Sequence, residues 1–537
     1  MEKLMNKYSE RREELLGFEN KFKLDYSEQD NIKFHPDYSF AVEFVDRVRC
    51  YEWYNLWFKA QHTEVGAPFL DTKNIIAKTK LFELIKKMPK GGLLHAHTDA
   101  SVPLGDVFKI AHKYGAFIQI KSTHPLTQHN IHFGLAKISF RPANQDKPPS
   151  IDASVMLTES YETGTWCNYN QLAQLAQHPD NNNIIPFIEK QMLITAEESY
   201  ITHNTMGKIW SKFGSCFGVL SGLIAFEPIW EEYIKRLVLR CVEDGVGYVE
   251  TRLLLINELS YDVNCNLRLT RRDSILIFLR GVESAKDVLR EEGRLDKFYG
   301  INIIYCTLRF VSEDELWNAM LTCLDIYKEF PTLIKGFDLV GHEESPSGHT
   351  LNDYLETLLR FQQKQIEEFG DIKIPYVFHA GETLHDGSIV DDNLYDALLL
   401  GTRRIGHGYS LYKHPTLMQM CKEKGVCVES CPISNEVLRL TGGIGNHPIA
   451  CLINHGVPVT LSSDDPAIFQ NAILSYDFYM LINHSNKTNL GTLKVLARNS
   501  IEYSLMDEED KSRVKGKWEQ DWEEYVRWLR RQGEEWK

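Results

Sequence analysis

The sequence predicts an α/β protein built on a (β/α)8 TIM barrel, with an N-terminal helical segment and a loop-rich insertion after the first strand. Eight short apolar runs recur along the chain, and helical stretches separate them, as is typical of parallel strands. Polar residues gather at the carboxyl ends of these runs, where barrel enzymes hold their active sites. The runs span residues 91–97, 245–254, 298–306, 334–343, 374–382, 403–408, 425–435 and 457–465.

A doubly wound sheet is the alternative fold. Such a sheet is expected to carry a glycine-rich phosphate turn after its first strand. Neither G-x-G-x-x-G nor G-x-x-x-x-G-K-[ST] occurs in the sequence, so the barrel is favoured.

Helical segments are predicted at both ends of the chain. Apolar residues recur at helical spacing through residues 40–60, whose second half carries Tyr51, Trp53, Tyr54 and Trp57. So many aromatic side chains favour packing against a larger body or a partner chain, and we expect a homodimer. The predicted division is a helical dimerisation segment at 1–87, the barrel at 88–505 with an insertion at about 115–205, and a C-terminal helix at 506–537.

Composition limits the classes of partner and the compartment. The formal net charge of −14 is poorly suited to a nucleic acid polymer, although one small nucleotide in a local pocket remains compatible with it. No apolar run approaches a membrane span, so no membrane partner is expected. The N-terminus has no apolar leader, and the eleven cysteines have no paired spacing. These features predict a cytoplasmic protein, with a secreted chain as the alternative.

The first apolar run ends in two histidines, within GGLLHAHTDA. His95 and His97 are two residues apart, so on a strand both imidazoles face the same way and can share one metal ion. The fifth run ends in His379 and the eighth in Asp464, and in a barrel all these ends meet at one mouth. Three imidazoles and one carboxylate suit a borderline metal, so one zinc ion per chain is predicted.

Two further groups at this mouth are suited to proton transfer. Glu382 lies three residues after His379 and can exchange a proton with a substrate atom. His407, in RIGHG, ends the sixth run and can accept a proton from water or orient it. Glu250 and Arg252 end the second run, and we expect them to form a structural ion pair under the site.

These motifs carry a family resemblance. HAHTDA, FDLVGHE, FHAGET, RIGHG, CPISN and SSDDPA, in this order, resemble the adenosine deaminase superfamily. MPKGGLLHAH, WSKF, SGLI, GFDLVGHE and LSYDFY are similar to one branch, the adenosine deaminase-related growth factors of the adenosine deaminase 2 type. The resemblance covers nearly the whole chain and implies a TIM barrel with an N-terminal dimerisation segment and an insertion after strand one.

The resemblance also implies an activity, the hydrolytic deamination of adenosine or 2′-deoxyadenosine to inosine or 2′-deoxyinosine with release of ammonia. Zinc would activate the attacking water. The roles it implies are zinc ligation for His95, His97, His379 and Asp464, protonation of purine N1 for Glu382, assistance to water for His407, contacts to N3 and N7 for Gly341 and Asp465, and a position near the sugar for Trp210.

The chain departs from the family's pattern in three places. Thr98 follows the second histidine where the growth-factor branch has an acid that contacts the ribose, and Asp99, one residue later, is expected to take over that contact. Leu308 stands where a polar residue is expected at the end of the third run. The insertion lacks the cysteine pair that staples it in secreted members, which favours an intracellular chain.

Three alternative functions remain open. An adenine nucleotide, AMP or ATP, could be the substrate, with phosphate donors in the insertion at Lys137, Arg141 and Lys147. A binuclear amidohydrolase commonly has a modified lysine at the end of strand four, but this run ends in Gly341 and His342 before Glu343. A catalytically inactive, growth-factor-like binding protein is the third, and retention of every predicted ligand argues against it.

Overall fold

The computed structural model describes residues 1–59, 64–143, 151–255 and 260–536. Its centre is a parallel β-barrel, and each of the eight predicted runs contains a strand. The strands form two four-stranded sheets, ordered β1-β5-β8-β9 and β10-β11-β12-β13. They are β1 (Gly91–His97), β5 (Val246–Leu254), β8 (Gly300–Leu308), β9 (Ile334–Val340), β10 (His379–Ala380), β11 (Arg404–His407), β12 (Cys427–Ser430) and β13 (Val459–Leu461).

Two parallel bridges join the sheets into a closed barrel. Phe337 of β9 pairs with Tyr376, just before β10. Ala96 of β1 pairs with Asp464, just after β13, and the backbone N–H of His97 donates to the Asp464 carbonyl at 3.0 Å. The prediction of a (β/α)8 barrel is therefore confirmed, and the carboxyl ends of all eight strands surround one mouth.

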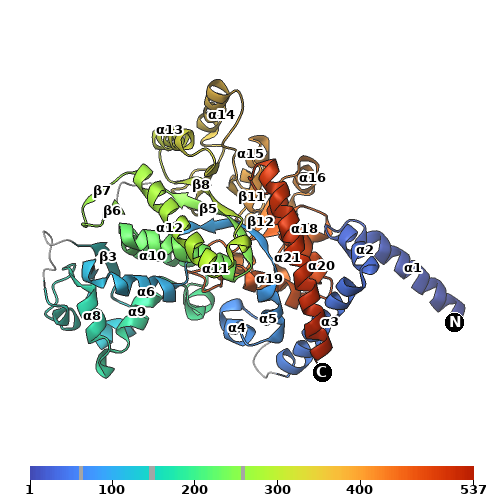
Figure 1. Cartoon of the computed structure of the whole chain (residues 1–537), viewed down its shortest axis with the longest axis horizontal. Helices are drawn as coiled ribbons and strands as arrows, with labels where there is room; N and C mark the ends of the chain where they lie inside the picture. The colour runs from blue at the N-terminus through green and yellow to red at the C-terminus, as the bar shows by residue number, and fades with distance from the viewer. Residues whose placement is uncertain (60–63, 144–150, 256–259, 537) are drawn as a thin grey trace.

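Helices follow the strands and pack around the barrel (Figure 1). Their ends carry expected signals: Thr270 and Ser312 begin helices with capping boxes, and Gly370 and Gly425 end helices in the left-handed conformation. The helices are α10 (Met206–Ile224), α11 (Glu227–Glu243), α12 (Arg271–Glu291), α13 (Glu313–Glu329), α14 (Leu355–Phe369), α15 (Asn393–Leu399), α16 (Pro415–Lys424), α17 (Pro432–Val437), α18 (Ile449–Asn454), α19 (Ser475–His484) and α20 (Leu490–Glu502).

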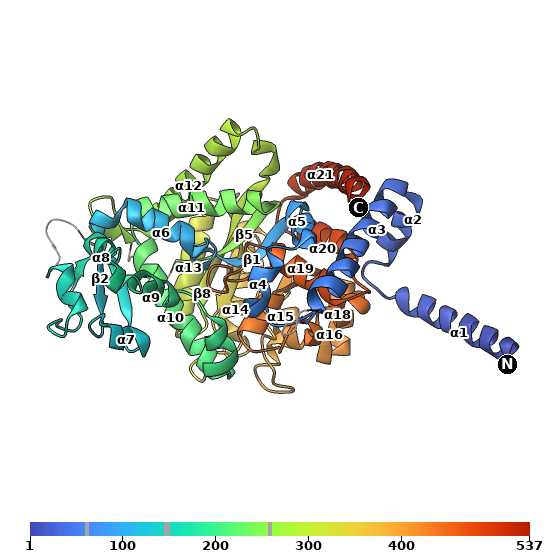
Figure 2. The same cartoon turned by 90° about the horizontal axis from the view of Figure 1, so that it is seen from below.

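The segment between β1 and α10 forms a small lobe at one side of the barrel (Figure 2). The predicted insertion contains a three-stranded antiparallel sheet in the order β3-β2-β4. The short strands β6 (Ser260–Tyr261) and β7 (Leu267–Leu269) pair separately after β5. The elements of the lobe are α6 (Leu104–Lys113), β2 (Ile118–Ser122), α7 (Gln128–His132), β3 (Ile138–Pro142), β4 (Cys167–Asn168), α8 (Tyr169–Leu175) and α9 (Ile184–Lys190).

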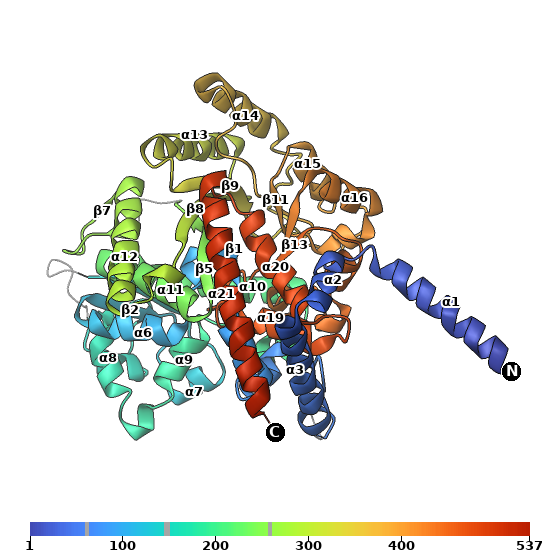
Figure 3. The ribbon, with the colours of Figure 1, turned by 45° about the vertical axis from the view of Figure 1, so that its right-hand side comes forward.

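The N-terminal and C-terminal helices pack together against the barrel (Figure 3). The long helix α21 lies beside α3 and α20 and buries Trp518 and Trp522. In contrast, α1 buries no residue and extends away from the body (Figure 1). These helices are α1 (Glu2–Asn20), α2 (Tyr26–Phe34), α3 (Pro36–Glu52), α4 (Phe69–Ile76), α5 (Lys80–Lys87) and α21 (Glu508–Glu535).

The aromatic run after α3 is less exposed than the sequence suggests. It continues from α3 as a π-helix, η1 (Trp53–Trp57). Trp57 is buried, and Trp53 donates its indole N–H to the carbonyl of Asn483, so both pack onto the chain's own body. Tyr51 and Tyr54 remain exposed. No helix in the described part of the chain is long and apolar enough to cross a membrane.

Candidate active site

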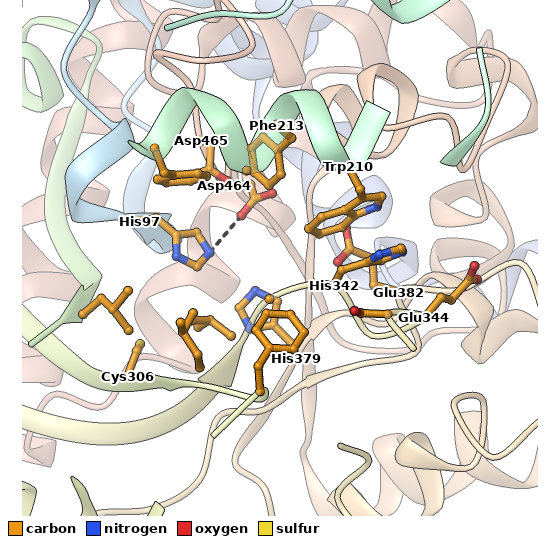
Figure 4. A pocket seen from close by; sticks show the side chains of 18 of the residues that line it. His97, Trp210, Phe213, Cys306, His342, Glu344, His379, Glu382, Asp464 and Asp465 are labelled. Carbon is orange, nitrogen blue, oxygen red and sulfur yellow. Dashed lines mark ion pairs between the residues drawn. The ribbon is translucent and has the colours of Figure 1, made fainter. Parts of the chain in front are cut away.

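A cavity of about 830 Å³ opens at the carboxyl ends of the strands (Figure 4). One wall is formed by α10, which contributes Trp210 and Phe213. The floor is formed by strand ends and the residues that follow them. Every predicted catalytic and substrate residue lines this cavity, as do three of the four predicted metal ligands: Asp99, Trp210, Gly341, Glu382, His407 and Asp465, with His97, His379 and Asp464. The fourth ligand, His95, is buried at the floor.

The predicted metal ligands converge on Asp464. The Nε2 atoms of His95 and His97 each lie 3.2 Å from Asp464 Oδ1, and the rings of His95 and His379 are 4.5 Å apart. His95 Nε2 is buried without a hydrogen-bond partner, and a bound cation would satisfy it. Nitrogen and oxygen atoms of His95, His379, His407 and Asp464 lie within 4.8 Å of one another, so this buried group could hold a metal ion. It includes His407 and not the predicted ligand His97, which instead groups with Asp464 and Asp465.

The charge states of these groups also suit a metal. Burial lowers the pKa of His379 to about 3, which keeps its imidazole neutral with a free lone pair. Burial alone would raise the pKa of Asp464, but the neighbouring His407, His95 and His97 hold it well below its usual range. The site therefore offers the neutral imidazole of His379 and the ionised carboxylate of Asp464, which are the forms that bind zinc and similar metals.

Two buried carboxylates orient the histidines. His95 Nδ1 lies 2.8 Å from Glu429, and His379 Nδ1 lies 2.7 Å from Asp338, so both rings turn their Nε2 atoms toward the centre. Asp338 and Glu429 were not among the predicted site residues. Their signal was a carboxylate inside an apolar strand run, because a charge buried there requires a partner.

The predicted ion pair between Glu250 and Arg252 is wrong. Arg252 instead binds Asp338 at 2.7 Å and Glu429 at 2.8 Å, while Glu250 binds Arg404 at 2.6 Å. Residues two apart on a strand point to the same side, and inside a barrel these long side chains reach partners on other strands. Arg252 thus joins the two carboxylates that orient the histidines.

The backbone of the site has one required glycine and two non-glycine residues with positive φ. A Cβ atom at Gly406 would lie 2.9 Å from the ring of His95, so the glycine in RIGHG allows the imidazole to pack there. His407 and Asp464 both have φ of 59°, a conformation that side chains other than glycine rarely adopt. Strain of this kind concentrates where a fold holds functional groups in place.

Glu382 and Asp465 face the cavity with unpaired oxygen atoms. Glu382 Oε1 and Asp465 Oδ1 are buried and have no hydrogen-bond partner in the described structure. Burial, with the nearby charges of Asp464 and Glu343, raises the pKa of Glu382 well above its ordinary value. Burial and the charge of Asp464 raise the pKa of Asp465 in the same way. Both groups are thus suited to carry a proton toward a ligand.

The other wall residues show where Thr98, Asp99, Trp210 and Leu308 lie relative to the cavity. The hydroxyl of Thr98 bonds Thr251 and the carbonyl of Arg252, away from the cavity, whereas Asp99 lines it. Trp210 and His342 lie face to face in Figure 4, and their ring centroids are 4.4 Å apart. Leu308 lines the cavity as well.

Gly341 has φ of 111°, and a Cβ atom there would lie 2.7 Å from the ring of Phe310. A glycine is therefore required at this position, and it brings the backbone to the cavity wall.

The predicted phosphate donors do not line the cavity. Of the described lysine and arginine side chains, only that of Arg252 does so, and carboxylates already bind it. Arg141 stacks on Trp166 in the lobe, and Lys137 is likewise absent from the cavity wall. Lys147 lies outside the described residues.

The sequence is similar to known proteins over most of its length. The model of the family described as adenosine deaminase matches residues 191–520, which is more than half of the chain. Adenosine deaminase 2 of Homo sapiens is 32% identical over 466 residues, covering 85% of this chain and 82% of that protein. The chain belongs to the adenosine deaminase family. Within that family, its relatives place it in the adenosine deaminase 2-like branch.

Solved structures share the fold of this adenosine deaminase family member. Arabidopsis ADAL complexed with GMP aligns with a TM-score of 0.53 at 15% identity, covering 82% of this chain and 98% of that chain. An amidohydrolase from Burkhoderia ambifaria with bound Zn aligns with a TM-score of 0.50 at 15% identity, covering 84% and 94%. At these identities the likeness concerns the fold.

The prediction of a cytoplasmic location is wrong. The relatives named adenosine deaminase 2 belong to a family known to be secreted. The unpaired cysteines favoured a reducing compartment. They do not identify the compartment, however, because most of the eleven cysteines are buried. Burial raises the pKa of buried thiols such as Cys323 and protects them from oxidation in any compartment.

Proposed function

We propose that this adenosine deaminase family member catalyses the hydrolytic deamination of adenosine and 2′-deoxyadenosine, using one zinc ion held by His95, His97, His379 and Asp464. The observation that supports this proposal is the position of Asp464, which lies 3.2 Å from both His95 and His97 and shares a buried group with His379, near the unpaired Oε1 atom of Glu382. Membership of the family makes the chain a hydrolytic deaminase. Retention of these residues argues against the inactive binding protein.

The donor set suits zinc. Three imidazoles and one carboxylate are typical zinc ligands, and a neighbour of the same fold contains bound Zn. A bound zinc ion supplies Lewis acidity, which makes water a nucleophile near neutral pH. Of the described residues that line the cavity, none is a lysine, so nothing favours the second metal of a binuclear site.

The chain's own residues bind the purine and move its protons. Glu382 carries a proton because its pKa is raised, and it donates that proton to purine N1 as water adds at C6. The carboxylate left on Glu382 takes up a proton from the added water, and the proton of the new C6 hydroxyl moves to the amino group, which leaves as ammonia. His407 orients the water. Asp465, whose pKa is also raised, donates to the acceptor N7. The backbone N–H of Gly341 donates to N3, and Trp210 covers the sugar side.

The cavity favours a nucleoside over a nucleotide, because the described residues that line it offer a phosphate no free lysine or arginine side chain. We expect the kcat/KM of the purified protein for adenosine and 2′-deoxyadenosine to exceed that for AMP and ATP, with ammonia release measured in each case. A higher value for AMP or ATP would show that the lobe supplies a phosphate site.

Asp99 is proposed to bind the sugar, since it lines the cavity where Thr98 does not. Asp99→Ala should raise KM for adenosine by about tenfold, the cost of one hydrogen bond to a charged group. Metal content should not change. Asp99→Asn keeps the size of the side chain and one acceptor oxygen, so its KM for adenosine should lie between those of the wild type and the alanine variant. Steady-state kinetics and metal analysis test this, and an unchanged KM in the alanine variant would remove Asp99 from the site.

The helical segment at 1–87 is proposed to form a homodimer. Helix α1 buries nothing within the chain yet exposes Leu4, Tyr8, Leu15 and Phe18. Light scattering should give about twice the chain mass of 62.1 kDa. Removing residues 1–20 should weaken the dimer and leave the barrel folded, since no core residue is lost. A full-length monomer without aggregation would contradict the proposal.

A further inference from the structure

A buried chain of polar groups leads from the cavity into the protein behind β11. His407 Nδ1 lies 3.1 Å from Asn435 Nδ2, and Asn435 Oδ1 lies 2.9 Å from His447 Nε2. His447 Nδ1 lies 3.1 Å from the backbone nitrogen of Ile449. Asn435 lies on α17, and His447 lies just before α18. All three side chains are at most 5% exposed, so water does not compete for these contacts.

The far end of this chain fixes the direction of every hydrogen bond. The backbone N–H of Ile449 can only donate, so His447 Nδ1 accepts. Burial lowers the pKa of His447 to about 3, so its ring is neutral and carries its one proton on Nε2. That N–H donates to Asn435 Oδ1, which leaves the Asn435 amide N–H to donate to His407 Nδ1.

We propose that Asn435 and His447 are positioning residues that set the tautomer of His407, so that its Nε2–H rather than a lone pair faces the reaction centre. The His407 Nδ1 lone pair is occupied by Asn435, so the ring proton resides on Nε2, 3.8 Å from Asp464 Oδ2. Glu382 Oε1 lies 3.5 Å from the same Nδ1 without a hydrogen bond, so it does not replace Asn435.

This inference rests on the proposed function and refines the role of His407. With a proton on Nε2, His407 can donate a hydrogen bond to the oxygen that attacks the purine. It cannot accept a proton at Nε2 without first losing the one that it carries. The relay thus assigns His407 to orienting the water and leaves proton delivery to Glu382.

Three substitutions alter the relay in different ways. Asn435→Asp preserves size but presents an oxygen to His407 Nδ1, which favours the opposite tautomer. His447→Phe removes both hydrogen bonds of the ring. His447→Gln is the matched control, because its amide can accept from the Ile449 N–H and donate to Asn435 Oδ1.

We expect Asn435→Asp and His447→Phe to lower kcat for adenosine by about tenfold or more. A loss of this size is expected when the His407 ring proton is on the wrong nitrogen. KM and the metal content should stay near those of the wild type. His447→Gln should retain kcat within about threefold. Wild-type kcat in a folded His447→Phe variant would overturn the inference, as would an equal loss in the Gln and Phe variants.

A spectroscopic measurement tests the tautomer without any change to the relay. In protein labelled with 15N-histidine, the His407 signals, assigned by their loss in His407→Gln, should show a protonated Nε2 and a bare Nδ1. A protonated Nδ1 in the wild type would overturn the inference. This measurement needs no substrate, so its result does not depend on the proposed function. The proposed function is contradicted by a different result, a wild-type protein that does not deaminate adenosine.

Discussion

His97→Ala is expected to abolish deamination and to lower metal content well below the value of about one zinc ion per chain expected for the wild type. His97 contributes one of three imidazoles, and its Nε2 lies 3.2 Å from Asp464. Removing one of the four proposed ligands weakens metal binding greatly, because the three that remain cannot complete the protein's share of the coordination shell. Elemental analysis and ammonia release, measured on the same preparation, test both expectations.

A matched control is available in His385, which is exposed and lies three residues after Glu382. His385→Ala should retain both the metal and the activity. Full activity in metal-free protein, or a full zinc complement in His97→Ala, would contradict the assignment of the ligands.

Glu382→Gln should lower kcat by roughly 10²-fold or more while zinc is retained. Glutamine keeps the shape of the side chain and the backbone hydrogen bond to Glu343, but it has no acidic proton to deliver to purine N1. KM should change little, since the amide can still contact the ring. Steady-state kinetics and metal analysis of the purified variant measure these quantities.

Glu344 provides the control for this prediction. Its carboxylate also lines the cavity, but its Oε1 atom accepts hydrogen bonds from Thr383 and Leu384, whereas Glu382 Oε1 is buried and unpaired. Glu344→Gln should therefore have a much smaller effect on kcat. Near-normal turnover in Glu382→Gln would show that another group protonates the purine.

The barrel was predictable from the sequence because its strands are short apolar runs that end in polar residues. His95 and His97 illustrate this, since strand alternation alone places both on one side. Once eight such runs are arranged in a barrel, His379 and Asp464 must reach the same mouth. In the structure His95 and His97 both lie 3.2 Å from Asp464, and His379 lies with His95 and Asp464 in one buried group that could hold a metal ion.

Pairings across the barrel were not predictable in the same way. Glu250 and Arg252 are close in sequence, but their partners, Arg404 and Asp338, come from strands far along the chain. Strand alternation gives the side to which a residue points and not the residue that it meets. The relay through His447 was missed for the same reason.

The packing of the N-terminal segment was only partly predictable. Helical spacing identified the amphipathic stretch before residue 60, but it could not tell packing on the chain's own body from packing on a partner. Trp57 packs inward, while Tyr51 and Tyr54 stay exposed.

The most direct test of the account is the formation of inosine and ammonia from adenosine by purified, zinc-loaded protein, with Glu382→Gln prepared in parallel as the blank. The account predicts equal amounts of the two products, loss of the reaction on chelation and recovery on addition of zinc. Absence of inosine from a folded protein that carries its full complement of zinc would contradict it.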